Sequence, residues 1–296
     1  MQPLIIGNHS LTWGQRTYVM GILNLTPDSF SGDGLLVSAA PDVPGDDAGL
    51  QQARRFLEAG VDILDIGGES TRPGSQPVEA AEEMRRVIPT IRAIVAAFPQ
   101  ALISIDTYKA VVAEEALKAG AAIVNDIWGL RADPDLAGVV ARARAAVVLM
   151  HNRSKSANVE VRERLGQAYL GAKYENLLDE VKSELLGSVA LARSAGIPDN
   201  HIILDPGLGF GKTVEQNLEL INRLNEIRAL GFPVLLGPSR KSFIGYTLNL
   251  PPDQRLEGTS ASVAVGITRG ADIVRVHDVE PILRVVHMTD AIVRQK

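Results

Sequence analysis

Short apolar runs alternate with longer amphipathic stretches along most of the chain. The clearest run covers residues 61–66 and is followed by Gly67-Gly68 and then by Glu69-Ser70-Thr71-Arg72. An apolar run of this length that ends at glycine is typical of a strand buried on both faces of a parallel sheet. Counting similar runs, we predict eight strands, at residues 18–23, 61–66, 102–105, 121–124, 145–150, 201–204, 232–236 and 272–274.

Helical or loop-like segments connect the predicted strands. Helices are predicted at 48–59, 79–98, 110–118, 169–195 and from Glu280 onward. Pro89 lies inside the second helix and should kink or split it, because proline lacks an amide donor and clashes with the preceding turn. Residues 31–47 are rich in Gly, Pro, Asp and Ser and predict a long loop that is functional or mobile. Residues 154–168 are polar and predict another loop.

Strands that alternate with helices predict a parallel sheet with right-handed crossovers. Eight such units fit a closed (β/α)8 TIM barrel, which typically has about 250 residues. An open doubly wound sheet is the alternative, but no dinucleotide-binding fingerprint follows the first strand. We therefore expect a single α/β barrel over residues 18–296. A short β-hairpin within residues 1–17 should cap one end of it, since Gly7, Asn8 and Gly14 suit turns.

Composition narrows the range of partners without changing the fold. The chain of 296 residues has a net charge of −5, which argues against nucleic acid and anionic membranes as partners. It has no cysteine, so disulfides and thiolate metal sites are excluded. Its first residues lack the pattern of a secretory signal, and no apolar run reaches the roughly 18 residues of a membrane span. A cytoplasmic protein is the default expectation.

Polar residues follow each predicted strand, and in a closed barrel these strand ends meet at one rim. A first set consists of the short acceptor side chains Asp106, Asn125 and Asp205. It suits a flat heterocycle that carries amino and ring N–H donors. A second set is cationic and rich in hydroxyl groups, as expected at a phosphate or pyrophosphate site. Its members are Thr71, Arg72, Ser239, Arg240, Lys241, Arg275 and His277.

Each of these residues taken alone has a plainer explanation as a helix cap or a surface ion pair. The prediction of a site rests on the mutual compatibility of all the strand ends. A P-loop is suggested by Pro206-Gly207-Leu208-Gly209-Phe210-Gly211-Lys212-Thr213, but that motif requires glycine where Pro206 stands. We therefore reject an ATP-binding P-loop, while Lys212 stays a candidate to face the pocket.

Five motifs, in order along the chain, resemble those of the dihydropteroate synthase family. They are Gly21-Ile22-Leu23-Asn24-Leu25-Thr26-Pro27-Asp28-Ser29-Phe30-Ser31, Gly67-Gly68-Glu69-Ser70-Thr71-Arg72-Pro73-Gly74, Asp205-Pro206-Gly207-Leu208-Gly209-Phe210-Gly211-Lys212, Ser239-Arg240-Lys241-Ser242 and Arg275-Val276-His277-Asp278. The resemblance covers nearly the whole chain from about residue 18. It implies a (β/α)8 barrel that condenses 6-hydroxymethyl-7,8-dihydropterin pyrophosphate with p-aminobenzoate, giving 7,8-dihydropteroate and pyrophosphate in folate biosynthesis.

The resemblance also implies roles for individual residues. The pterin would be held by Asp106, Asn125, Asp205 and Lys241, with Met150 and Phe210 against the ring. Arg275 would stack on the pterin and reach the pyrophosphate, which would be bound by Asn24, Thr71, Arg72 and His277. Asn24 would also bind Mg²⁺, and Ser242 would receive the carboxylate of p-aminobenzoate at a helix N-terminus. The expected catalytic residues are Arg72, Asp106, Lys241, Arg275 and His277, and the expected assembly is a homodimer.

Two departures from the family pattern and two rival functions stand beside this interpretation. The chain has Asn152-Arg153-Ser154 where the family often has Met-Gln-Gly, and the loop from Gly32 to Asp47 is longer and richer in proline than expected. A methyltetrahydrofolate:corrinoid methyltransferase would share the barrel and the acidic pterin pocket but would not use a pyrophosphate clamp. A non-catalytic pterin-binding paralogue would keep the pocket and bind pterin without turnover.

Overall fold

The eight central strands of the protein form a parallel ring, as seen in a computed structural model that describes residues 1–26, 45–155 and 158–294. The ring contains β3 (Tyr18–Asn24), β4 (Ile63–Gly67), β5 (Ile103–Asp106), β6 (Ile123–Asp126), β7 (Ala146–Met150), β10 (Ile202–Asp205), β11 (Leu235–Leu236) and β12 (Ile273–Val276). Hydrogen-bonded neighbours follow the order β10-β7-β6-β5-β4-β3-β12-β11. A parallel bridge between Leu204 and Val234 joins the two ends of this sheet. The predicted (β/α)8 barrel is confirmed.

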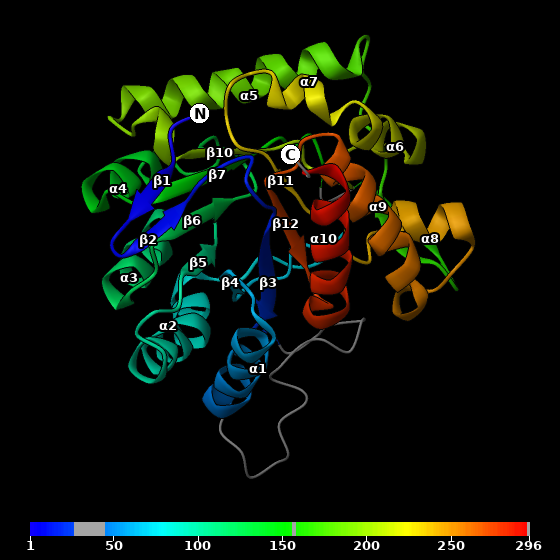
Figure 1. The fold of residues 1–296 in the computed structure, drawn as a ribbon. Helices are drawn as coiled ribbons and strands as arrows, with labels where there is room; N and C mark the ends of the chain where they lie inside the picture. Colours follow the sequence, from blue (N-terminus) through cyan, green and yellow to red (C-terminus); the bar gives the residue numbers. More distant parts are fainter. Residues whose placement is uncertain (27–44, 156–157, 295–296) are drawn as a thin grey trace.

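Helices cover the outside of the strand ring (Figure 1). They are α1 (Gly45–Ala59), α2 (Ala80–Ala97), α3 (Ala110–Ala119), α4 (Leu136–Ala143), α5 (Leu177–Ser194), α6 (Val214–Asn222), α7 (Leu224–Arg228), α8 (Ser242–Leu248), α9 (Leu256–Thr268) and α10 (Val279–Val293), with short 3-10 turns η1 (Asp199–His201) and η2 (Pro252–Gln254). Local sequence sets several of their ends. For example, α3 stops at Gly120, whose φ of 118° favours glycine. A capping box between Thr213 and Gln216 begins α6.

The barrel interior below the strand ends is filled by apolar side chains. The N-terminal hairpin is present as β1 (Leu4–Ile6) and β2 (His9–Leu11). Its residues Leu4 and Leu11 belong to one buried cluster with inward-facing strand residues, among them Met20, Ile63 and Ile123. The hairpin therefore contributes to the packing of the barrel interior, as its predicted capping role requires.

Helix α2 runs without interruption from Ala80 to Ala97 with Pro89 inside it. The prediction that proline would split this helix is therefore wrong. Pro89 is exposed, whereas Val87, Ile88, Thr90 and Ile91 around it are buried. Because Pro89 has no amide hydrogen, the carbonyl of Arg85 loses its helical donor, and on the solvent face water can replace it. The packing of the inner face holds the helix together.

The segment after β7 differs from the sequence prediction. Residues 159–169, expected as loop and helix start, form an antiparallel hairpin of β8 (Val159–Arg162) and β9 (Gly166–Tyr169). Helix α5 begins only at Leu177, where the Asn176 side chain accepts a hydrogen bond from the Asp179 amide at 3.2 Å. Pattern alone missed this hairpin because its strands are short and mostly polar or exposed.

Two further sequence predictions concern the segment between β3 and the end of α1, of which residues 27–44 are not described. The predicted loop over 31–47 lies outside the described residues up to residue 44, and its last residues, 45–47, are wrong as loop because they belong to α1. The predicted helix over 48–59 is confirmed within α1. Across the part of the chain that the structure describes, no helix combines the length and apolar character needed to span a membrane.

Candidate active site

A cavity of about 440 Å³ opens at the carboxyl ends of the barrel strands. The structure brings together around it the residues to which the family resemblance assigns roles, whereas Lys212 is not among the lining residues. The residues brought together are Asn24, Thr71, Arg72, Asp106, Asn125, Met150, Asp205, Phe210, Lys241, Ser242, Arg275 and His277. Convergence follows from the parallel ring, in which all strands end on the same side.

A buried polar layer forms the floor of this cavity. Arg275 on β12 donates from Nε to Asp65 Oδ2 and from Nη2 to Asp106 Oδ2, each at 2.6 Å. Asn125 on β6 donates from Nδ2 to the same Asp65 oxygen at 3.1 Å. Asp65 thus accepts hydrogen bonds from both Arg275 and Asn125. The contact with Asn125 uses its side-chain nitrogen and does not involve its side-chain oxygen.

The charges in this layer shift one another's protonation. Burial raises the pKa of Asp106 to about 7 although Arg275 opposes the shift, and the Asp65 carboxylate adds to it. Burial alone would lower the pKa of Arg275, but Asp65 and Asp106 hold it above its ordinary value. Arg275 therefore stays charged, whereas Asp106 exchanges its proton near neutral pH.

Asp205 and Lys241 both line the cavity wall and affect each other's protonation. Asp205 Oδ1 accepts a hydrogen bond from the Gly207 amide at 2.7 Å. Lys241 Nζ donates to the Leu208 carbonyl at 2.5 Å and lies 4.9 Å from the centre of the Phe210 ring. Burial lowers the pKa of Lys241 to about 8, with Asp205 opposing the shift. Burial also raises the pKa of Asp205, and Lys241 opposes that shift.

The cationic set lies around the polar layer. His277 follows β12, and its Nδ1 lies 3.0 Å from Ser239 Oγ, which also accepts a hydrogen bond from the His277 amide at 3.1 Å. Arg240 also lines the cavity, but its guanidinium binds the Asp278 carboxylate through two hydrogen bonds. Arg72 and Thr71 reach the cavity from the loop that follows β4.

An ionic cluster fixes the base of the loop that carries Thr71 and Arg72. Lys109 bridges the carboxylates of Glu69 and Glu83, and the Tyr108 hydroxyl donates to Glu69 at 3.1 Å. Glu69 also accepts a hydrogen bond from the Val78 amide at 3.0 Å. Both ends of the loop are therefore tied to the barrel by the Glu69 side chain.

The protein side offers few ligands for a metal ion. The described residues contain no group of three or more His, Cys, Asp or Glu side chains arranged to hold one. Asn24 lines the cavity at the end of β3 and supplies one amide oxygen. Such a donor set suits Mg²⁺ that keeps most of its water and phosphate ligands, and it does not suit a protein-only cage.

Lys212, in the glycine-rich segment after β10, does not line the cavity, so the expectation that it could face the pocket is wrong. Lys212 is buried and donates to the carbonyls of Gly207 and Phe210 and to His151 Nδ1, at 2.9, 3.1 and 3.0 Å. Gly207 has a φ of 70°, and a Cβ there would lie 1.8 Å from the His151 carbonyl oxygen. Glycine at this position therefore allows the segment to pack closely against the His151 main chain.

His151 and the unusual residues after it lie outside the cavity lining. Burial lowers the pKa of His151 to about 2, so its ring is neutral and accepts the Lys212 hydrogen bond. Asn152 Oδ1 accepts hydrogen bonds from the Ser154 amide and hydroxyl at 2.8 and 2.7 Å. Arg153 pairs with Glu180 and Glu184 of α5. The departure at residues 152–154 thus forms a local turn anchored to α5.

Sequence reasoning missed three parts of the site. Asp65 lies inside an apolar strand, where a lone carboxylate was the available signal. The β8–β9 hairpin contributes Tyr169 and its turn to the cavity lining, and Arg255 contributes from the start of α9. Neither the hairpin nor Arg255 belongs to a strand end, so no rule based on strand ends could find them.

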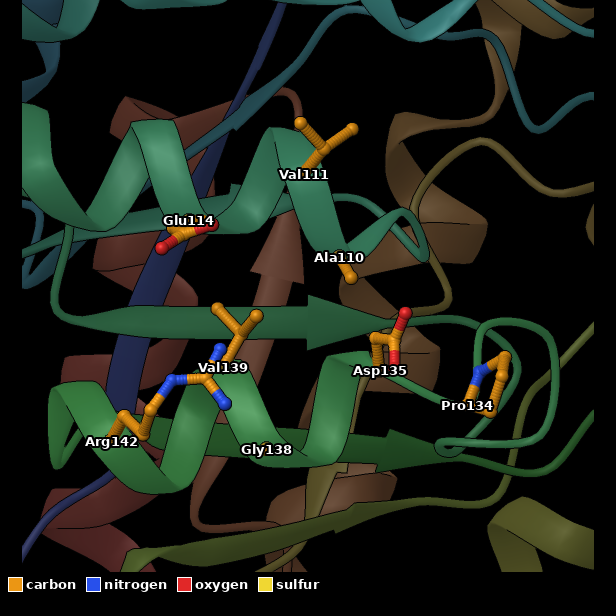
Figure 2. A pocket seen from close by; sticks show the side chains of 8 residues that line it. All are labelled: Ala110, Val111, Glu114, Pro134, Asp135, Gly138, Val139 and Arg142. Atoms are coloured by element: carbon orange, nitrogen blue, oxygen red, sulfur yellow. The ribbon is translucent and has the colours of Figure 1, made fainter.

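A second hollow of about 350 Å³ lies outside the barrel between α3 and α4 (Figure 2). It is lined by Val111 and Glu114 of α3, by Arg142 of α4 and by the turn before α4. It contains none of the strand-end residues. We therefore assign the chemistry to the cavity at the strand ends.

Comparison with known proteins identifies the family of this chain. The family model described as "Pterin binding enzyme" matches residues 20–277. The chain is 47% identical to dihydropteroate synthase of Clostridium beijerinckii, covering 98% of this chain and 99% of that protein.

Solved structures show the same similarity. A Clostridium difficile dihydropteroate synthase crystallised in the presence of pteroic acid has a TM-score of 0.84 and 47% identity, covering 96% of this chain and 99% of that one. A Xanthomonas albilineans dihydropteroate synthase with 4-aminobenzoic acid has a TM-score of 0.83 and 37% identity, covering 96% and 94%. The chain therefore belongs to the pterin binding enzyme family, among its dihydropteroate synthases.

Proposed function

We propose that the cavity condenses 6-hydroxymethyl-7,8-dihydropterin pyrophosphate with p-aminobenzoate to give 7,8-dihydropteroate and pyrophosphate, a step of folate biosynthesis. The observation that carries the proposal is the placement of an acceptor-rich floor and a cationic rim in one cavity of about 440 Å³. A flat heterocycle fits the floor, and an anionic leaving group fits the rim. The relatives crystallised with pteroic acid and with 4-aminobenzoic acid support the same pair of substrates.

The pterin would lie on the polar layer. Asp106, the Asn125 carbonyl oxygen and Asp205 present acceptors to its amino and ring N–H donors. Lys241 would add a donor, and Met150 and Phe210 would pack against the ring. Arg275 is held in place by its two carboxylates, and its planar guanidinium would stack on the pterin while reaching toward the pyrophosphate.

The pyrophosphate would lie against Thr71, Arg72, His277 and Asn24. Mg²⁺, which we propose as the cofactor, would neutralise charge on the pyrophosphate oxygens and share the Asn24 amide oxygen. When the C–O bond breaks, positive charge spreads over the pterin methylene and negative charge over the leaving group. Arg72, Arg275 and His277 would stabilise that separation of charge, which makes electrostatic stabilisation the main catalytic device.

The second substrate would enter beside Ser242, whose hydroxyl would receive the carboxylate of p-aminobenzoate. An aryl amine is already neutral at pH 7, so its nitrogen needs no strong general base before attack. The reaction would then be led by departure of the pyrophosphate, with Asp106, Lys241 and Arg275 holding the pterin as charge develops. The loop after β4, which carries Thr71 and Arg72, would close over the pyrophosphate.

Formation of dihydropteroate from the two substrates, with and without Mg²⁺, tests this proposal. We expect turnover that depends on the metal. A folded protein that binds 6-hydroxymethylpterin but forms no product would instead be a non-catalytic pterin-binding paralogue. The cationic rim argues against a corrinoid methyltransferase, which releases no pyrophosphate.

We also propose a homodimer, as expected from the prevalence of symmetric pairs among soluble proteins. Val265 on α9 and Met288 and Ile292 on α10 are exposed apolar residues on two neighbouring helices. A mass of one chain in sedimentation equilibrium at micromolar concentration would contradict it. The cytoplasmic location expected from the sequence stays part of this proposal.

A further inference from the structure

Arg255 is an unusual component of the cavity wall. It is only 3% exposed, yet among the described residues no carboxylate forms a salt bridge with its guanidinium. Burial lowers the pKa of Arg255 below its ordinary value, although arginine stays charged at neutral pH. A buried charge without an ionic partner is costly, so its retention in a cavity wall calls for a function.

Main-chain carbonyls from three separate segments take the place of a carboxylate. Nη1 of Arg255 donates to the Arg240 carbonyl at 2.8 Å, and Nη2 donates to the Leu165 carbonyl at 2.6 Å. Nε and Nη2 both reach the Leu250 carbonyl, at 3.3 and 3.2 Å. One guanidinium thus joins the turn of the β8–β9 hairpin, the turn that precedes Lys241 and the chain after α8.

Helix α8 has a glycine, Gly245, at the point where it contacts the Arg255 guanidinium. Gly245 lies within α8, and a Cβ at this position would lie 2.1 Å from Arg255 Nη2. Glycine is unfavourable inside a helix, so its presence here needs a packing reason. The approach of the guanidinium supplies that reason.

The segments that Arg255 joins lie where the second substrate would enter. Arg240 has a φ of 55°, a left-handed conformation that is uncommon for a residue with a side chain, and Lys241 and Ser242 follow it directly. The hairpin turn around Leu165 lines the same cavity. The Arg255 hydrogen bonds therefore hold together two walls of one entrance.

We propose that Arg255 is a positioning residue for the second substrate. By fastening the β8–β9 hairpin to the Arg240–Ser242 turn, it shapes the wall that receives an aryl amine bearing a carboxylate. Its unpaired charge makes that wall attractive to an anion. This inference rests on the proposed function and names the element that selects the second substrate.

Variants of two residues distinguish the effect of the position of the Arg255 guanidinium from the effect of its charge. Arg255→Lys keeps the charge but cannot reach three carbonyls with a rigid fork, and Arg255→Met removes both charge and donors. Gly245→Ala keeps Arg255 and displaces its guanidinium by steric contact alone. Gly187→Ala in α5 is the matched control, because a Cβ there meets nothing within 4 Å.

Steady-state kinetics give the first readout. We expect Arg255→Met to raise the KM for p-aminobenzoate about tenfold or more, since hydrogen bonds to a charged group are lost. Arg255→Lys and Gly245→Ala should raise it in the same direction, whereas the KM for dihydropterin pyrophosphate should change less than that for p-aminobenzoate. Gly187→Ala should match the wild type. Equal changes in both KM values, or full activity of Arg255→Met, would overturn the proposal.

A second readout does not need turnover. Arg162 and Arg164 are exposed residues of the hairpin, and loosening it should let the backbone around them unfold into the active site of trypsin. We expect faster cleavage there in Arg255→Met and Gly245→Ala than in wild type or Gly187→Ala; equal rates would contradict the fastening role. Preference for p-aminobenzoate over neutral p-aminobenzamide should fall in Arg255→Met more than in Arg255→Lys. A wild-type protein that forms no dihydropteroate would refute the proposed function, while the trypsin result would still decide the fastening role.

Discussion

The two halves of the barrel interior are built from the same strands but do different work. In the amino half, Ile63, Ile123 and Ile273 belong to an apolar cluster that the N-terminal hairpin completes. Two residues further along β4 and β12, Asp65 and Arg275 form the polar layer. Alternate residues of a strand face the same way, so the two layers are separated by about 7 Å along each strand. On both β4 and β12, the residue in the apolar cluster and the residue in the polar layer of the site are therefore only two positions apart.

The halves should also differ in what they contribute to stability. Burying the isoleucines of the amino half stabilises the fold by roughly 1.5–3 kcal/mol for each side chain. In the polar layer, the attraction between Arg275 and its two carboxylates is offset by the loss of their hydration. Asp65 Oδ1 is buried and has no hydrogen-bond partner among the described residues, which adds to that cost. The polar layer is therefore better explained by ligand binding than by folding.

The largest effect is expected from Arg275→Ala. We predict that kcat/KM falls by about 1000-fold or more, because charge developing in the transition state loses its main cation. The far-ultraviolet circular dichroism spectrum should stay native, since the apolar half is untouched. Arg284→Ala on the surface of α10, where Arg284 pairs with the exposed Glu280, is the control and should keep wild-type activity. Near-normal turnover by Arg275→Ala would remove Arg275 from the catalytic residues.

The converse experiment changes a residue of the apolar cluster in the amino half, Ile123. Ile123 is fully buried and does not line the cavity. Ile123→Ala should lower the free energy of unfolding by about 2–5 kcal/mol in urea titration. Its kcat/KM should stay within about twofold of wild type under conditions where the variant is folded. A large loss of activity in this folded variant would break the proposed division between the two halves.

Titration of Asp106 provides a third contrast, because no carboxylate belongs to the apolar cluster that the described residues form in the amino half. With a pKa raised to about 7, the free protein carries a proton on Asp106 at pH 6. N–H donors of a pterin favour the carboxylate, so binding should release nearly one proton at pH 6 and very few at pH 8.5. Calorimetry of 6-hydroxymethylpterin binding in buffers of different ionisation enthalpy measures this number, and Asp106→Asn should abolish most of it. Proton release that does not depend on pH would contradict the assignment.

The same shift has a consequence for stability. Between about pH 4 and pH 7 the folded chain holds a proton on Asp106 that the unfolded chain has lost. Because the folded state binds more protons in this window, the contribution of Asp106 to the free energy of unfolding falls as pH rises toward 7. In Asp106→Asn this contribution should disappear, and the pH dependence of the urea midpoint should become flatter.

The sequence predicted the apolar half and the strand ends because both follow simple periodic rules. Runs such as residues 61–66 and glycines such as Gly120 determine local structure directly. The role of Asp65 in the site was not predicted, because its partners Arg275 and Asn125 are distant in the sequence and contact it only in the folded barrel. The β8–β9 hairpin and Arg255 were also not predicted as parts of the site. Their contacts are to main-chain carbonyl groups, which no pattern of side chains reveals.

The smallest effect concerns the link between the hairpin and the polar half. The Tyr169 hydroxyl lies 3.3 and 3.4 Å from the carbonyls of Thr71 and Arg72, and its ring lies 5.9 Å from that of Phe210. Tyr169→Phe keeps the ring contact and removes the hydroxyl. A neutral hydrogen bond of this kind predicts a rise of about threefold to tenfold in the Kd for dihydropterin pyrophosphate, measured without p-aminobenzoate. The Kd for 6-hydroxymethylpterin, which has no pyrophosphate, should stay unchanged.

Tyr246→Phe is the matched control for this experiment, because the Tyr246 hydroxyl contacts the Gly166 carbonyl on the other side of the same hairpin at 3.4 Å. It removes an equivalent group without touching the loop of Thr71 and Arg72. If the two variants weaken binding of the pyrophosphate compound equally, the hairpin acts only as a general support. If Tyr169→Phe alone does so, the polar half depends on a main-chain contact outside the strands, whereas the apolar half depends on the strands and the N-terminal hairpin.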